Sequence, residues 1–198
     1  MWRLTPVDPK ALARELPDQA GDAHPAANTV TQFLTLLANS PTTLRAYLQA
    51  EQALGNGRLT PVQREMISLL VAEINGSNYC LAAHELAAKQ AGLSDQEIWS
   101  ARKALSGDSQ TRAMLNFVQA IVLQRGEISD DDFSAMRDAG FADGQIIEVL
   151  ANIVLNIFTN YFTLLAQPGR EQPLARPDWK SGPAERAGGE NQPAEATT

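Results

Sequence analysis

The chain has 198 residues, of which 44% are hydrophobic and 20% are charged, a composition typical of a globular domain. Its 16 basic and 23 acidic side chains give a net charge of −7. This charge argues against nucleic acid as the main partner, because binding phosphates needs a basic surface. The single cysteine cannot form an intramolecular disulfide, which excludes a secreted disulfide scaffold.

The ends of the chain differ in character from its middle. Residues 1–25 are expected to form an irregular arm, and residues 1–19 contain no apolar run of signal-peptide length. Residues 168–198 are crowded with proline, glycine and charge, which predicts a largely disordered tail. The folded domain is therefore expected to span residues 26–167.

Helical periodicity dominates this middle region, and no clear strand-like alternation is present. Ser40-Pro41 and Thr60-Pro61 have the pattern of an N-cap followed by proline at the first helical position. Asn75-Gly76 and Gly92 are typical helix ends, and "SDQE" (94–97) is a capping box. The expected helices cover residues 29–38, 40–54, 61–74, 77–91, 109–125, 130–138 and 143–167, with a further helix starting at 94–97. The sequence therefore predicts an all-α fold.

The most apolar stretch, residues 146–166, carries a polar residue at every fourth position. A membrane-spanning segment tolerates few such residues, so we expect a cytoplasmic protein with no membrane contact. The stripe could pair with helices of a neighbouring subunit, or it could face water. Its members are Glu148, Asn152, Asn156 and Asn160.

The stretch "NGSNYCLAAHEL" (75–86) holds the chain's cysteine, Cys80, and one of its two histidines, His84. If Ser77 is the N-cap, Cys80 lies in the first helical turn, where the helix dipole lowers the pKa of a thiol. His84 follows one turn later on the same face and can accept the thiol proton.

The imidazole of His84 would need a carboxylate to orient it, and the preceding helix offers Glu65 and Glu73. Helical periodicity does not choose between them, because Glu73 falls within the apolar sector and Glu65 on its edge. A packed core cysteine, a satisfied histidine and a solvated Glu65 explain the same residues without any catalysis. One cysteine and one histidine supply too few ligands for a tetrahedral metal site, and no cofactor motif is present.

The segment "QREMISLLVAEINGSNYCLAAHELAAKQAGLSDQEI" (63–98) resembles the core of the alkyl hydroperoxidase D-like, carboxymuconolactone decarboxylase superfamily, in particular its peroxidase-related branch. The resemblance extends over roughly residues 40–167. It implies an all-α helical bundle that assembles into trimers or hexamers. It also implies that Cys80 is the peroxide-attacking cysteine, and that Glu65 and His84 are its proton relay. Tyr79 stands where the family commonly has a tyrosine or a histidine.

Two positions depart from the family pattern. Ser77 replaces the resolving cysteine, so the family's intramolecular disulfide cannot form. The closing helix reads Asn160-Tyr161-Phe162-Thr163-Leu164 where the branch often has Asn-Tyr-Phe-Asn-His. From the sequence we expect this change to remove a polar group from the site or from an interface.

Three functions remain open from the sequence. The first is a one-cysteine peroxidase, in which Cys80, His84 and Glu65 are catalytic and an external thiol or a reductase protein restores the enzyme. The second is a non-redox acid–base enzyme, in which Cys80 only lines the pocket. The third is a helical oligomeric protein with a degenerate site. Further candidates for the substrate pocket are Ser77, Tyr79 and Glu73.

Overall fold

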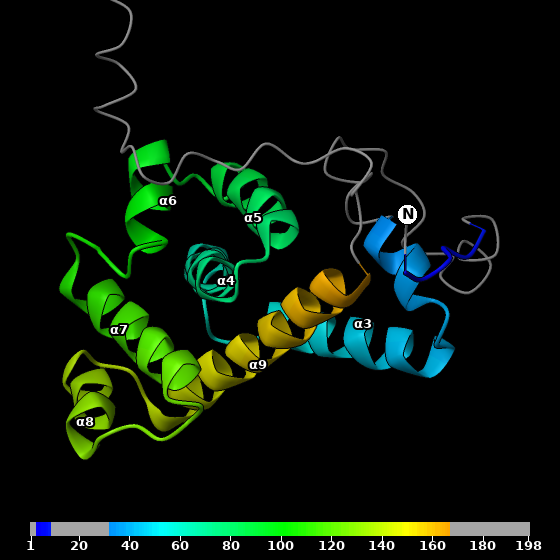
Figure 1. Cartoon of the computed structure of the whole chain (residues 1–198). Coiled ribbons are helices and arrows are strands. Elements are labelled where there is room, and N and C mark those ends of the chain that lie inside the picture. Colours follow the sequence, from blue (N-terminus) through cyan, green and yellow to red (C-terminus); the bar gives the residue numbers. More distant parts are fainter. Residues whose placement is uncertain (1–2, 9–31, 167–198) are drawn as a thin grey trace, which may run out of the picture.

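The computed structural model describes residues 3–8 and 32–166, and its ordered elements are all helices (Figure 1). The tail expected at residues 168–198 lies outside the described residues, as does most of the arm at 1–25. A short helix covers residues 32–37. The longer helices are α3 (Pro41–Gly55), α4 (Pro61–Asn75), α5 (Asn78–Gln90), α6 (Asp95–Ala101), α7 (Ser109–Leu123), α8 (Asp130–Asp138) and α9 (Asp143–Ala166).

Local caps define the helix ends, as the sequence predicts. The side chains of Ser40, Thr60 and Ser94 each accept a hydrogen bond from a backbone N–H in the first turn of α3, α4 and α6. Gly76 ends α4 with a φ of +67°, a conformation that favours glycine. The joint between α4 and α5 is therefore short and fixed, and it sets the angle at which the first turn of α5 meets its neighbours.

Helix α4 is the centre of the bundle. Figure 1 shows it nearly end-on, with α5, α7 and α9 around it, and it packs most extensively against these three helices. Its middle turns are fully enclosed, since Ile67, Leu69, Val71 and Ala72 expose none of their surface. A carboxylate on α4 is therefore attached to the most rigid part of the molecule.

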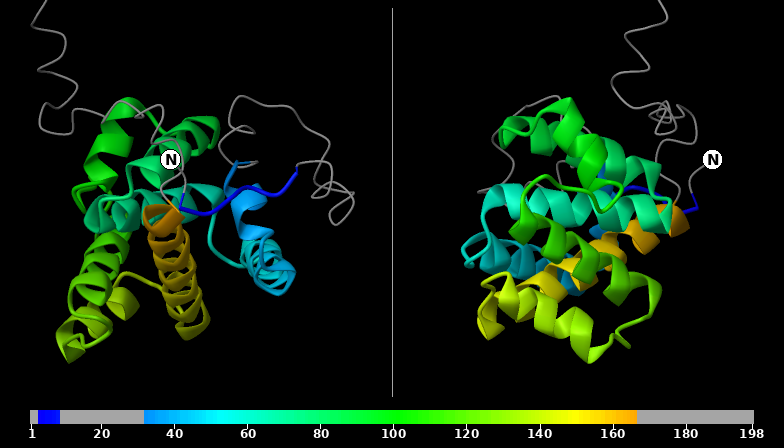
Figure 2. Two further views of the ribbon diagram at one scale, coloured as in Figure 1. Left: turned by 45° about the vertical axis from the view of Figure 1, so that its right-hand side comes forward. Right: turned by 90° about the vertical axis from the view of Figure 1, so that its left-hand side faces the viewer.

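Helix α9 lies between the α7–α8 pair and α3 (Figure 2). It is long and apolar enough to be a candidate membrane span by length and composition alone. Its polar stripe, however, points into the protein: Asn152, Asn156 and Asn160 are at most 9% exposed. Neither orientation expected from the sequence, towards water or towards a neighbouring subunit, is correct, because this face of α9 packs on α4.

A second, smaller cluster joins the N-terminal part of the domain to the end of α9. Phe33 packs edge-on against Tyr47 of α3 and against Phe162 of α9, and Phe158 stacks near Phe162. These aromatic contacts hold α3 and the 32–37 helix over one end of α9, where they form one wall of the cavity described below.

Candidate active site

Cys80 is a free thiol in the first turn of α5 and is 6% exposed. Ser77 is the N-cap of this helix, as predicted, and its hydroxyl accepts a hydrogen bond from the Cys80 backbone N–H at 3.5 Å. Ser77 is itself 1% exposed. The residue that stands in place of a resolving cysteine is therefore a buried cap directly beside the thiol.

The sulfur of Cys80 lies against α9. Its Sγ atom is 3.3 Å from Oγ1 of Thr163, and the same Oγ1 is 3.0 Å from Oγ of Ser77. Thr163 is one of the two residues at which the closing helix departs from the family pattern. Its hydroxyl keeps a polar group in direct contact with the sulfur, so the polar group that the sequence expected to be lost is lost only at Leu164, which is 44% exposed.

Burial raises the pKa of the Cys80 thiol above its ordinary value, while hydrogen bonds from Ser77, Thr163 and Thr159 act in the opposite direction. This net direction is the reverse of the one expected from the helix position. The dipole at a helix N-terminus is worth up to about 2 kcal/mol, whereas desolvation of a nearly enclosed thiolate costs more. Cys80 is therefore a protonated thiol at neutral pH and needs a base to activate it.

His84 lies one turn further along α5, and its Nδ1 atom is 3.0 Å from Oε2 of Glu65 on α4. A carboxylate only accepts hydrogen bonds, so Nδ1 donates and Nε2 of the neutral ring remains free to accept a proton. The side chains are 25% and 22% exposed, which leaves the pair partly screened from water. Glu65 is thus positioned to orient the His84 ring.

Glu73, the other carboxylate considered from the sequence, has a different partner. Its Oε2 atom is 2.9 Å from Nε of Arg102, which also contacts Glu85 at 2.6 Å. The Arg102 side chain is 4% exposed, so this is a largely buried ion-pair cluster that connects α4, α5 and the end of α6. Glu73 is therefore held in the framework and does not line the cavity at Cys80.

Cys80 and His84 share a cavity of about 110 Å³. Helices α3, α5 and α9 and the 32–37 helix contribute its walls, and Tyr79 lies on one of them. On the α3 side of the cavity, the hydroxyl of Tyr47 donates to Glu51 at 3.0 Å. The cavity is lined by Phe33, Tyr47, Glu51, Tyr79, Cys80, Ala83, His84, Asn156, Thr159 and Thr163.

The residues that the sequence analysis missed come from other elements. Phe33, Tyr47 and Glu51 precede the motif by about thirty to fifty residues, and Thr159 and Thr163 follow it by about eighty. Two signals were available in the sequence: the asparagine stripe of α9, which contains the cavity residue Asn156, and the departure from the family pattern at residues 160–164, which contains Thr163. Burial raises the pKa of both Tyr47 and Tyr79, so the two phenols in this wall remain protonated at neutral pH.

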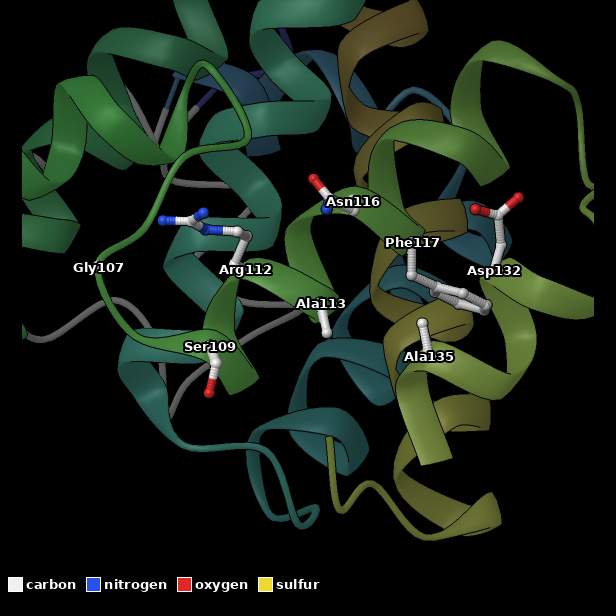
Figure 3. Close-up of a pocket in the computed structure, with 8 residues that line it drawn as sticks. All are labelled: Gly107, Ser109, Arg112, Ala113, Asn116, Phe117, Asp132 and Ala135. Atoms are coloured by element: carbon white, nitrogen blue, oxygen red, sulfur yellow. The ribbon is translucent and has the colours of Figure 1, made fainter. Parts of the chain in front are cut away.

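A larger cavity of about 420 Å³ lies between α7 and α8. Its two charged side chains, Arg112 and Asp132, lie at opposite ends of the lining group (Figure 3), and the Arg112 guanidinium is bonded to the carbonyl of Ser106 at 2.9 Å. No cysteine or histidine lines it. Within residues 3–8 and 32–166, no group of three or more His, Cys, Asp or Glu side chains is placed to hold a metal ion. Of these two cavities, the smaller one at Cys80 is lined by a cysteine and a histidine and is the candidate active site.

Comparisons with known proteins place this arrangement in a wider group. Residues 41–122 match the carboxymuconolactone decarboxylase family model. No curated protein matches the chain. An uncharacterized peroxidase-related protein from Silicibacter sp. TM1040 is 27% identical, with 68% of this chain and 73% of that chain covered and a TM-score of 0.63.

Two further solved structures share the fold at lower identity. The alkylhydroperoxidase AhpD core of an uncharacterized peroxidase-related protein from Ralstonia eutropha JMP134 is 23% identical. That match covers 86% of this chain and 93% of the other, with a TM-score of 0.70. The debrominase Bmp8, as its C82A variant in complex with 2,3,4-tribromopyrrole, is 15% identical, with 83% and 89% covered and a TM-score of 0.67.

Proposed function

Since the chain belongs to the alkyl hydroperoxidase D-like, carboxymuconolactone decarboxylase superfamily, we propose that it is a thiol-dependent peroxidase that reduces hydroperoxides through Cys80 alone. One observation carries the proposal: a buried thiol and a carboxylate-oriented imidazole line the same small cavity. A cavity of this size accepts a small organic hydroperoxide or hydrogen peroxide.

The proposed first half-reaction begins with Nε2 of His84 taking the Cys80 proton, while Glu65 stabilises the resulting imidazolium. The thiolate then attacks the distal peroxide oxygen. An S–O bond forms, the O–O bond breaks, and the departing alkoxide takes the proton from His84 to leave as an alcohol. Sulfur is oxidised by two electrons to a sulfenic acid, and the peroxide is reduced by the same two electrons.

The second half-reaction needs an external reductant, because the chain has one cysteine. A first thiol attacks the sulfenic sulfur, expels water and forms a mixed disulfide; a second thiol attacks that disulfide and releases Cys80. Both reductant classes expected from the sequence, a small thiol and a reductase protein, supply these two thiols. The 6% exposure of Cys80 favours the small thiol, and the reducing cytoplasm is the compartment that provides one.

We also propose that the chain acts as a homo-oligomer, a trimer or hexamer. The support is a row of exposed apolar side chains on the outer face of α9. The most exposed are Ile147, Val154, Tyr161 and Leu165.

The activity is tested by treating the purified chain with one equivalent of hydrogen peroxide and measuring its intact mass. We expect a gain of one oxygen atom on Cys80, reversed by dithiothreitol. Cys80→Ser should abolish the gain, and His84→Ala should slow it by about a hundredfold, the usual contribution of a general base. Loss of Glu65, as Glu65→Gln, should also slow it, whereas Glu127→Gln, an exposed carboxylate, should not.

The same variants separate the alternatives. A wild-type chain that gains no oxygen contradicts the peroxidase proposal. Activity on a lactone or carboxylated substrate that survives in Cys80→Ser but not in Glu65→Gln would indicate the non-redox acid–base enzyme instead. Loss of bromide from 2,3,4-tribromopyrrole, the ligand of the debrominase, without any reaction with peroxide would likewise exclude peroxide as the substrate. No reaction with any of the three would indicate an oligomeric protein with a degenerate site.

A further inference from the structure

The hydroxyl of Thr163 lies within hydrogen-bond distance of three groups, although it has only one proton to donate. Its Oγ1 atom lies 2.9 Å from the carbonyl oxygen of Asn160, 3.0 Å from Oγ of Ser77 and 3.3 Å from Sγ of Cys80. Thr163 is 3% exposed, so these contacts are enclosed. A threonine hydroxyl has one proton to donate and two lone pairs with which to accept.

With a protonated thiol, one arrangement of these protons gives every donor an acceptor. The Asn160 carbonyl can only accept, and in this arrangement it receives the Thr163 proton. The two lone pairs of Oγ1 then receive the Ser77 O–H and the Cys80 S–H. Oγ of Ser77 in turn accepts the backbone N–H of Cys80. Every hydroxyl and thiol proton in the group is used, and the sulfur is held as a donor.

Deprotonation changes what the sulfur requires, because a thiolate can only accept hydrogen bonds. Rotation about the Cβ–Oγ1 bond of Thr163 turns its proton from the Asn160 carbonyl to the sulfur without moving a heavy atom. That carbonyl keeps the regular helical hydrogen bond, since α9 continues to Ala166. Ser77 continues to donate to Oγ1, which strengthens the bond that Thr163 makes to the sulfur.

We propose that Thr163 is a positioning residue whose hydroxyl accepts from the Cys80 thiol at rest and reverses to donate to its thiolate, with Ser77 polarising it from behind. The inference rests on the proposed function for its role in turnover, but the reversal is a property of the thiol alone. It gives Ser77 a role at the position of the missing resolving cysteine: its hydroxyl lies beside the attacking sulfur and also bonds the Thr163 hydroxyl that contacts that sulfur.

The other ionisable groups around Cys80 come from each element packed on it. His84 and Tyr79 belong to its own helix, Glu65 to α4, and Tyr47 and Glu51 to α3. Helix α9 contributes no charged group to this cavity, so its effect on the thiol runs through its hydroxyls. The carboxylates of Glu65 and Glu51 disfavour a thiolate, which makes a donor on the α9 side more important.

The experiment measures the rate of alkylation of the full-length chain by iodoacetamide as a function of pH, with intact mass as the readout. Thr163→Val should raise the apparent pKa of Cys80 by about one unit, a roughly tenfold loss of thiolate at neutral pH, because a charge-assisted hydrogen bond is removed. Thr163→Ser keeps the hydroxyl and should restore the wild-type profile.

The matched control is Thr35→Val. Thr35 is a buried helical threonine whose hydroxyl also bonds the carbonyl three residues earlier, but it does not line the cavity. Its variant should show the wild-type pH profile. Equal profiles for Thr163→Val and wild type would overturn the proposal, as would failure of Thr163→Ser to restore a shifted profile.

The two proposals fail in different ways. A shift in Thr163→Val together with no oxygen transfer from peroxide would leave the positioning role standing and remove the peroxidase. Oxygen transfer in the wild type together with an unshifted Thr163→Val profile would leave the peroxidase and remove the positioning role.

Discussion

At Cys80, two physical effects act on the same proton in opposite directions. Its place in the first turn of α5 favours the thiolate through the helix dipole, and its burial favours the thiol. Burial is the larger effect, so the pKa of Cys80 is raised. In the proposed mechanism His84 must therefore remove the thiol proton as a general base, because no thiolate exists beforehand.

The raised pKa of Cys80 has a consequence for stability. The folded state holds the thiol proton more tightly than the unfolded state, so stability is fully present below the ordinary thiol pKa and decreases as pH rises through it towards the folded value. We expect the free energy of unfolding in urea to fall between about pH 7 and about pH 9.5, and Cys80→Ser to show a smaller fall.

Tyr47 and Tyr79 contribute little in this interval, because the ordinary pKa of tyrosine is about 10 and both are raised further by burial. Their contribution to the pH dependence is therefore the same in the wild type and in Cys80→Ser, and it cancels when the two slopes are compared. Equal slopes for the wild type and Cys80→Ser would contradict the assignment of a raised pKa to this thiol.

Asn160 is a buried polar residue whose side chain has no hydrogen-bond partner among the described residues. Both Oδ1 and Nδ2 are unpaired, and the residue is fully enclosed. Leu has nearly the same shape without the polar atoms. We expect Asn160→Leu to raise the free energy of unfolding by about 1 kcal/mol, because no partner is left unpaired when the amide is removed.

The control for this substitution is Asn152→Leu, one of the same stripe, whose amide donates to the Glu148 carbonyl at 2.8 Å. That variant should lose stability in the same urea titration. An Asn160→Leu protein less stable than Asn152→Leu would show that the Asn160 amide has a role in the fold that outweighs its burial.

At the scale of elements, the sequence predicted what depends on neighbouring residues. The caps at Ser40, Thr60, Ser77 and Ser94 are local hydrogen bonds, and the structure confirms them. The all-α fold is confirmed over the described residues for the same reason, since helical periodicity is a local pattern.

What the sequence could not supply was the partner of each helix face. A polar residue at every fourth position shows that Asn152, Asn156 and Asn160 share a face, but not whether that face meets water, a subunit or the core. Similarly, Glu65 and Glu73 differ on a helical wheel by less than a quarter turn. Only the position of Arg102, far along the chain, separates the carboxylate that holds the framework from the one that holds His84.

Because Arg102 connects α4, α5 and the end of α6, its substitution tests how much this ion-pair cluster stabilises the fold. Its guanidinium contacts both Glu73 and Glu85. Removing it takes the guanidinium away from two largely buried carboxylates and leaves Glu73 with only the longer contact to Lys103, and breaking a buried ion pair costs about 3 kcal/mol or more. We expect Arg102→Met to lower the free energy of unfolding by about that amount in a urea titration.

Lys103 provides the comparison, because its ammonium is 3.6 Å from the same Glu73 but its side chain is 27% exposed. A partly solvated contact of this kind is worth less than about 1 kcal/mol, so Lys103→Met should have a small effect. Equal losses in the two variants would mean that burial does not strengthen the Arg102 cluster.

At the scale of the whole molecule, α9 has two faces with different surroundings. The inner face carries the asparagines and Thr163 and packs on α4 and α5. The outer face is apolar, and no charged residue occurs between 149 and 166. Exposed apolar residues lie on this face at spacings of three, four or seven residues, which correspond to about one or two helical turns. They are Ile147, Leu150, Val154, Tyr161 and Leu164, with Leu165 beside them.

Single exposed apolar residues are ordinary, but a continuous row along one helix is typical of a surface that is covered in solution. A spacing of three and four residues is the pattern by which one helix packs against another. A second copy of the chain carries the same row and can cover it symmetrically. We therefore predict that light scattering after size-exclusion chromatography gives the mass of a trimer or hexamer.

Charged substitutions test whether the outer face of α9 is the subunit contact. Ile147→Lys and Val154→Lys together place two cations in the row, and desolvating them would cost more than the apolar contacts return, so the double variant should elute as a monomer. Both side chains are more than half exposed, so its helical circular dichroism should match the wild type. Leu123→Lys, equally exposed at the end of α7, should leave the mass unchanged. A monomeric wild type, or a double variant of wild-type mass, would exclude this face of α9 as the subunit contact.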